Sequence, residues 1–458
     1  MILRPLGSME YTYWMMGLSS RTNFTVTSRL AGSFSNQSLV KALGAVQKKQ
    51  QLLNVIIVPD RRYGAVFEYC PAGTPIPLQV EDFPSPPEND LCCDTPFIRR
   101  IEKEQQTDLT TGPPPSTSSR PLMRCLLLRH GGDRSTLVLT FHHAIADALS
   151  AVSLLRDLLE HLSGDANDGA QMKDCRNEVP APLDTCLPKH STGIAAFGKL
   201  ATHSFLQTIG RIHPGQVHLP VDLQCRTDER RDRFITTVLD QPFCTVLLRT
   251  AKENGCTVHS ALCASLLLAL REEYPSKAAI RTWLLSLVDL RRRFIPPGNA
   301  GILCLMISMI ESLFSVSRTT PLWSLAAEIV ARNDRLIRSG FHFSYFPAMT
   351  RIIRATSFLR RGDTTGSRKM LRQGQLSRPP VLSVSTIGNI EPAGLSGAVH
   401  CDEVSFFLPL SSSGLFGAAI NRYNGRLYWN FSYAAPAISQ ERARRLAGRS
   451  VEILKNAL

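Results

Sequence analysis

Apolar side chains recur at helical spacing in several segments of the chain. The clearest run follows residue 148, where Leu149, Val152 and Leu155 fall on one face. Residues 258–274 are apolar nearly all round, which predicts a buried helix that Thr257 caps. The further helices that we expect cover 9–16, 38–50, a segment ending at Gly255, 323–338, and a last segment from about 439.

Shorter apolar or alternating segments between turn residues predict β-strands. Residues 24–27 alternate, so we expect a strand with one wet face. Two turns predict hairpins, at 131–134 and at Asn424-Gly425, and the second is the stronger signal. The expected strands cover 24–27, 52–58, 123–129, 136–141, 234–239, 283–288, 381–385, 404–408, 415–420 and 427–431.

The predicted elements fall into two groups of similar size, each with helices and strands. Between them Gly, Asp, Asn, Pro and His recur, with one short helical possibility near 194–208. A chain of 458 residues is also too long for one ordinary core. We therefore expect an α+β protein with an N-terminal lobe at 1–165, a connector at 166–229 and a C-terminal lobe at 230–458.

Composition narrows the class of protein. The longest apolar runs, 262–270 and 302–310, are about half a membrane span, which predicts buried core and no transmembrane segment. The first residues lack the apolar region of a signal peptide. Twelve cysteines contain no CxxC pair, so neither a disulfide framework nor a zinc site is indicated. We expect reduced thiols, a cytoplasmic location and a monomer.

The net charge of +14 favours anionic partners without identifying one. Eleven Lys or Arg residues lie between positions 332 and 378 against two acidic residues. This run is either a solvated face or a docking surface for an anionic acyl donor. The chain has no recognisable nucleic-acid module, G-x-S-x-G elbow, P-loop or dinucleotide fingerprint. Nucleic-acid binding, serine hydrolysis and phosphoryl or hydride transfer therefore have no support in the sequence.

One segment has the composition of a catalytic site. The apolar strand 136–141 runs directly into His142, His143 and, four residues later, Asp147. A turn between a buried strand and a helix can aim an imidazole into a cleft, and histidine can accept and return a proton near neutral pH. A zinc site is possible by ligand type, but adjacent histidines at a strand end point to opposite faces.

HHAIADA resembles the HHxxxDG motif of nonribosomal peptide condensation domains and their acyltransferase relatives. Four further segments are most similar to the branch that contains phthiocerol dimycocerosyl transferases and alcohol acetyltransferases. These segments are RPLGSMEYTYWM, TVHSALCASLLLAL, SLVDLRRRFIPP and VSTIGNIEP. The resemblance spans residues 4 to about 446. It implies two chloramphenicol-acetyltransferase-like lobes that form a V, with the active site in the cleft between them. DFGWG, typical of plant BAHD enzymes, is absent.

The resemblance also implies roles for single residues. His143 would be the general base, while His142 would support the turn. Asp147 would pair with an arginine of the second lobe, for which Arg291 fits better than Arg292 or Arg293, since three consecutive arginines at a strand end cannot all face inward. Ala148 replaces the glycine of the motif, which is tolerated unless that position needs a positive φ.

We therefore expect an O-acyltransferase that moves an acyl group from a thioester to a small-molecule alcohol. Acyl-CoA, or the phosphopantetheine thioester of an acyl carrier protein or polyketide synthase, would be the co-substrate, with no bound cofactor or metal. Two alternatives stay open. The chain could form an amide as a condensation-type enzyme, or it could be a non-catalytic member of the fold that only binds a carrier.

Overall fold

The computed structural model describes residues 2–18, 20–85, 93–110, 120–164, 179–188, 198, 215–294, 301–343, 350, 382–391 and 398–458. Most of the expected connector at 166–229, its helical possibility near 194–208 and most of the basic run at 332–378 lie outside these ranges.

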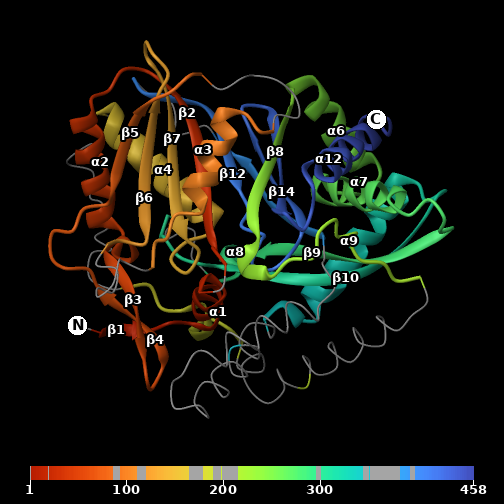
Figure 1. The fold of residues 1–458 in the computed structure, drawn as a ribbon, viewed down its shortest axis with the longest axis horizontal. Coiled ribbons are helices and arrows are strands. Elements are labelled where there is room, and N and C mark those ends of the chain that lie inside the picture. The colour runs from red at the N-terminus through yellow and green to blue at the C-terminus, as the bar shows by residue number, and fades with distance from the viewer. Residues whose placement is uncertain are drawn as a thin grey trace.

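A five-stranded sheet forms the centre of the first half of the chain (Figure 1). Its middle strand β7 (Arg134–His142) pairs antiparallel with β2 (Asn23–Ala31) and with β6 (Met123–Arg129). One edge strand is β5 (Leu78–Asp82). The other is β12 (His400–Phe407), which comes from the second half of the chain and pairs antiparallel with β2. The two halves of the sequence therefore share one sheet.

Both faces of this sheet are covered. Helices α2 (Asn36–Lys49) and α4 (Ala148–Ser163) share one core with Leu137 and Leu139, whereas α3 (Pro96–Gln105) joins Val138 in another. The expected wet face of the strand at 24–27 is therefore wrong: Asn23 to Ser28 are all buried. Alternation of Thr with apolar residues indicates polarity, but it does not show which side chains a helix will cover.

A second, six-stranded sheet runs β10-β9-β11-β13-β14-β8. Helices α6 (Gln241–Glu253), α7 (Val258–Glu272), α9 (Leu322–Arg338) and α12 (Gln440–Lys455) lie beside it on the side away from the first sheet (Figure 1). Their apolar faces and the sheet share one core. The strands are β8 (Arg231–Leu239), β9 (Ala279–Asp289), β10 (Ile307–Ser317), β11 (Leu382–Ile390), β13 (Phe416–Tyr423) and β14 (Arg426–Ala435).

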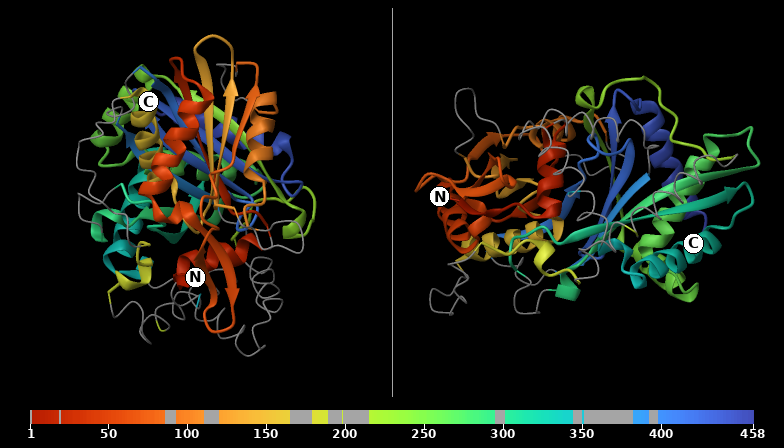
Figure 2. Two further views of the ribbon diagram at one scale, coloured as in Figure 1. Left: turned by 90° about the vertical axis from the view of Figure 1, so that its left-hand side faces the viewer. Right: turned by 90° about the horizontal axis from the view of Figure 1, so that it is seen from below.

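The chain begins in a small third sheet with the order β1-β4-β3. It contains β1 (Ile2–Pro5), β3 (Val55–Asp60) and β4 (Gly64–Tyr69), and lies near α1 (Ser8–Gly17) at the lower edge of the molecule in Figure 1. Seen from below, in the right-hand view of Figure 2, the first part of the chain (red to yellow) lies beside the second part (green to blue). The α+β class is confirmed. The boundaries at 165 and 230 and the V shape stay predictions.

Turn and cap signals in the sequence were reliable. Asn424 and Gly425 have φ values of 47° and 74°, as a two-residue hairpin of type I′ requires. Thr257 accepts a hydrogen bond from the Ser260 N–H at the start of α7. The apolar run 262–270 lies in α7, and no helix in the described part of the chain is long and apolar enough to span a bilayer.

Candidate active site

His142 is the last residue of β7, and His143 begins the turn that joins β7 to α4. β7 is buried from Ser135 to His142, so the start of the turn is fixed by the core. Asp147 is the N-cap of α4: its Oδ1 accepts the Ser150 N–H at 3.1 Å, and Ser150 Oγ accepts the Asp147 N–H at 3.1 Å. Such a capping box satisfies two backbone donors that would otherwise lack partners.

Ala148 is the first residue of α4 and adopts a right-handed helical conformation. In the described part of the chain only Asp94 and Asn424 have a positive φ among residues other than glycine. The position therefore does not need the conformational freedom of the glycine in the motif, and alanine is a good helix former.

His143 is oriented by a hydrogen bond to the backbone. Its Nδ1 lies 2.9 Å from the carbonyl oxygen of Ala146, which can only accept, so Nδ1 carries the proton. In the neutral ring Nε2 then keeps its lone pair. The side chain is 4% exposed and lines a pocket. This is the tautomer that a general base needs.

Two aromatic rings pack against the imidazole of His143. Tyr13 of α1 stacks on His143 with ring centroids 4.1 Å apart and planes 24° apart, and Phe24 of β2 packs at 4.9 Å with a tilt of 49°. Neither residue was singled out from the sequence. The only signal was the aromatic richness of 9–16, which does not say which ring meets the histidine.

Burial keeps both histidines neutral. Desolvation lowers the pKa of His143 to about 4, although the carboxylate of Asp147 acts in the opposite direction. Desolvation, with His143 as a further cause, lowers the pKa of His142 to about 3. At neutral pH His143 is therefore ready to accept a proton.

His142 faces a different environment from His143. Its Nδ1 accepts the backbone N–H of Ala144 at 3.1 Å, and the side chain is 2% exposed. The bond closes the turn locally. In the described residues no three His, Cys, Asp or Glu side chains are placed to hold a metal ion.

Asp147 and Arg291 form a buried ion pair. Oδ1 of Asp147 lies 2.8 Å from Nη2 of Arg291, and the two side chains are 3% and 9% exposed. Burial is the largest influence on Arg291 and lowers its pKa, but the neighbouring groups, among which the charge of Asp147 contributes most, together outweigh burial and raise the pKa. No hydrogen bond between Asp147 and His143 is present in the described structure. The structure thus places together the two residues that the resemblance paired.

The arginines lie in a short helix, α8 (Arg291–Phe294), and not at a strand end as expected. Arg291 also donates to the carbonyl oxygen of Cys304 at 3.0 Å, and the Met306 N–H donates to Asp147 Oδ2 at 2.8 Å. Residues 301–306 therefore form a strap that ties the second half of the chain to the turn. The strap ends where β10 begins.

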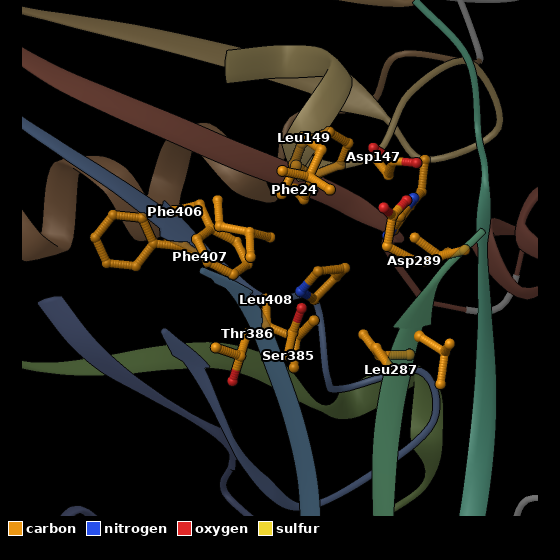
Figure 3. A pocket seen from close by; sticks show the side chains of 16 residues that line it. Phe24, Asp147, Leu149, Leu287, Asp289, Ser385, Thr386, Phe406, Phe407 and Leu408 are labelled. Carbon is orange, nitrogen blue, oxygen red and sulfur yellow. The ribbon is translucent and has the colours of Figure 1, made fainter. Parts of the chain in front are cut away.

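The pocket beside His143 is built from both halves of the chain and has about 490 Å³ of unfilled space, including space open to solvent. In Figure 3 Asp147 and Asp289 lie on one side, and Phe406 and Phe407 on the other. Most of the remaining lining is apolar. The lining comes from β2, the start of α4, the ends of β9 and β12, the start of β10, and Ser385, Thr386 and Ile387 of β11.

Comparisons with known proteins agree with this arrangement. Residues 228–421 match the family described as phthiocerol/phthiodiolone dimycocerosyl transferase C-terminus. A phosphinothricin tripeptide synthetase from Streptomyces viridochromogenes is 28% identical over 136 residues, which is 30% of this chain. The match spans only 12% of that synthetase.

Solved structures of other proteins align with nearly the whole length of this chain. Polyketide synthase associated protein 5 from Mycobacterium tuberculosis has a TM-score of 0.60 at 14% identity, over 99% of this chain and 97% of its own. A trichothecene 15-O-acetyltransferase from Fusarium sporotrichioides has a TM-score of 0.70 at 10% identity, over 98% and 94%. The first condensation domain of the calcium-dependent antibiotic synthetase has a TM-score of 0.64 at 15% identity, over 98% and 95%.

These findings confirm the α+β class and the predicted similarity to condensation and acyltransferase domains, and they agree with the predicted class of enzyme, an acyltransferase. The chain therefore has the fold of the superfamily of condensation domains and related acyltransferases, as its HHxxxD segment predicted, and residues 228–421 carry the match to the phthiocerol/phthiodiolone dimycocerosyl transferase branch.

Proposed function

We propose that this protein transfers an acyl group from a thioester to a hydroxyl group of a small molecule, with His143 as the general base. The observation that carries the proposal is the state of His143. Its Nδ1 proton is held by Ala146, and the ring lines an apolar pocket with the Nε2 lone pair available.

The reaction balances with His143 alone as the proton carrier. Nε2 takes the proton of the acceptor hydroxyl as that oxygen attacks the carbonyl carbon of the thioester. The C–O bond forms, the C–S bond breaks, and the departing sulfur takes the proton from the imidazolium. The products are an ester and a free thiol, and the histidine returns to its neutral state.

The other predicted residues act through the position of His143. His142 closes the turn through Ala144, and the Asp147–Arg291 pair fixes the start of α4 against the strap. Tyr13 and Phe24 hold the plane of the ring. We assign all of these side chains positioning roles, because none of them needs to exchange a proton in the reaction.

The donor is acyl-CoA or a carrier-bound phosphopantetheine thioester. The names of two neighbours, a polyketide synthase associated protein and an acetyltransferase of a trichothecene, support a role in secondary metabolism. The cytoplasmic location and the monomeric state stay predictions.

The test measures both products in one reaction. Purified protein is mixed with acyl-CoA, or with an acylated carrier protein, and with a set of alcohols. Free thiol is followed with a thiol reagent and ester by mass spectrometry. The proposal predicts equal amounts of thiol and ester, formed only when the alcohol is present. Thiol release without ester would mean hydrolysis, and no turnover with either donor would support a non-catalytic carrier-binding protein.

Amide formation is the second candidate, and the match to a tripeptide synthetase is the observation that favours it. Uncharged amines are therefore included as acceptors. A product that is an amide, with no ester from the corresponding alcohol, would replace the first proposal by the second.

A further inference from the structure

The pocket beside His143 has an acidic end. Asp289 is the last residue of β9 and lies near Asp147, opposite Phe406 and Phe407 (Figure 3). Its backbone is fixed by the pairing of β9 with β10, where Asp289 lies opposite Ile307. The carboxylate is therefore held at the wall of the pocket by the sheet itself.

Among the described residues, hydrogen bonds reach only one of the two carboxylate oxygens of Asp289. Oδ1 accepts the backbone N–H of Arg291 at 3.1 Å and Nη1 of Arg291 at 3.2 Å. Oδ2 has no hydrogen-bond partner in the part of the chain that the structure describes. The side chain of Asp289 is 31% exposed and lines the pocket.

Among the described side chains at this end of the pocket, negative charges outnumber positive ones. Asp147 and Asp289 share the single guanidinium of Arg291, and burial keeps His143 neutral. The described residues that line the pocket include no Lys or Arg. The group of three therefore has one excess negative charge next to a mostly apolar wall. A carboxylate in such surroundings interacts most favourably with a cation that also donates hydrogen bonds.

We propose that Asp289 binds a protonated amine of the acyl acceptor. This inference rests on the proposed function and adds a substrate class to it: an amino alcohol whose ammonium group lies against Oδ2 while its hydroxyl reaches His143. The ammonium is not the nucleophile, because protonation occupies its lone pair. An acceptor with an anionic group at the same place is rejected by the like charge.

The test compares two acceptors that differ in one group. One is an amino alcohol, and the other is the same alcohol with a methyl group in place of the ammonium. The wild-type protein is expected to prefer the amino alcohol by about 10- to 100-fold in kcat/KM, the usual worth of a hydrogen bond to a charged group. Asp289→Asn keeps the shape and an acceptor for Arg291 but removes the charge, and should abolish this preference.

Asp402→Asn is the matched control. Asp402 is an aspartate of similar exposure, 33%, paired with Arg134 outside the pocket, so its substitution should leave the preference unchanged. Asp289→Glu retains the charge and should restore part of the preference that Asp289→Asn loses. This second variant separates the role of the charge from any loss of stability through Arg291.

Calorimetric binding of the amino alcohol, without an acyl donor, tests the site independently of catalysis. Weaker binding to Asp289→Asn than to wild type supports the inference even if no ester forms and the proposed function fails. Two results overturn it: an equal preference in wild type and Asp289→Asn, or a wild-type preference for the neutral alcohol.

Discussion

Removing either partner of the Asp147–Arg291 pair should destabilise the protein strongly. The pair joins the cap of α4 to the second half of the chain, and both side chains are more than nine-tenths buried. Loss of one partner leaves the other charge uncompensated in the interior. The expected cost for Asp147→Ala or Arg291→Ala is about 3–5 kcal/mol of unfolding free energy.

The double variant should cost less than the sum of the two single variants. In either single variant the remaining charge is buried without its partner, and the second substitution removes that charge. The coupling energy between the two substitutions is therefore expected to be about 2–3 kcal/mol. The coupling does not equal the full single cost, because Asp147 also accepts the N–H groups of Ser150 and Met306, and Arg291 also donates to Cys304 and Asp289. These contacts are lost whichever partner is removed second.

Urea unfolding of wild type, the two single variants and the double variant measures the coupling directly. The exposed pair Arg134–Asp402 is the control, where a coupling of about 1 kcal/mol or less is expected. If the Asp147 and Arg291 variants were additive within about 0.5 kcal/mol, the structural role of the pair would be wrong.

Four further predictions concern the two histidines and Tyr13. His142→Ala should lower the unfolding free energy by about 1–3 kcal/mol, since the Ala144 N–H loses its acceptor, and unchanged stability with lost turnover would reverse the roles of the two histidines. The kcat/KM of a neutral acceptor should be flat from pH 7 to 5 and fall as the pH drops through about 4, where His143 gains a proton; a midpoint near 6.5 would contradict its burial. Over the same range stability should fall as the pH drops below about 6.5, because unfolded histidine binds protons that folded His142 and His143 do not. Tyr13→Ala should lower kcat up to about tenfold, whereas Tyr13→Phe keeps the stack and should retain the rate; equal losses would indicate a role for the hydroxyl.

Much of the fold could be predicted because it depends on local signals. The helices at 38–50 and 323–338 have clear apolar faces, and the hairpin at Asn424-Gly425 requires its positive φ values. Strand β10 was recognised only as buried apolar sequence, since a short apolar run does not distinguish strand from other core. The place of β12 in the first sheet depends on pairing across more than 350 residues with β2, which no local pattern encodes.

For the candidate site, too, the sequence identified residues in local motifs but not residues that join the site through tertiary contacts. HHxxxD identified His142, His143 and Asp147, and the resemblance supplied Arg291, because these residues have fixed places in a motif. Tyr13, Phe24 and Asp289 were missed, because each belongs to the site only through tertiary contact. Asp289 stood in the same VDLR segment that identified Arg291, so a search of charged neighbours in that segment could have found it.

The most direct test of the account is the turnover of His143→Ala. Thiol and ester formation by this variant are compared with wild type at equal folded concentration, and with His400→Ala, whose ring is 49% exposed and lies outside the pocket. We expect His143→Ala to fold with a lower unfolding midpoint, because the ring is buried and loses its bond to Ala146, and to lose about 100- to 10,000-fold in kcat. His400→Ala should behave as wild type. Turnover of His143→Ala within threefold of wild type, in a folded protein, would contradict the assignment of His143 as the base.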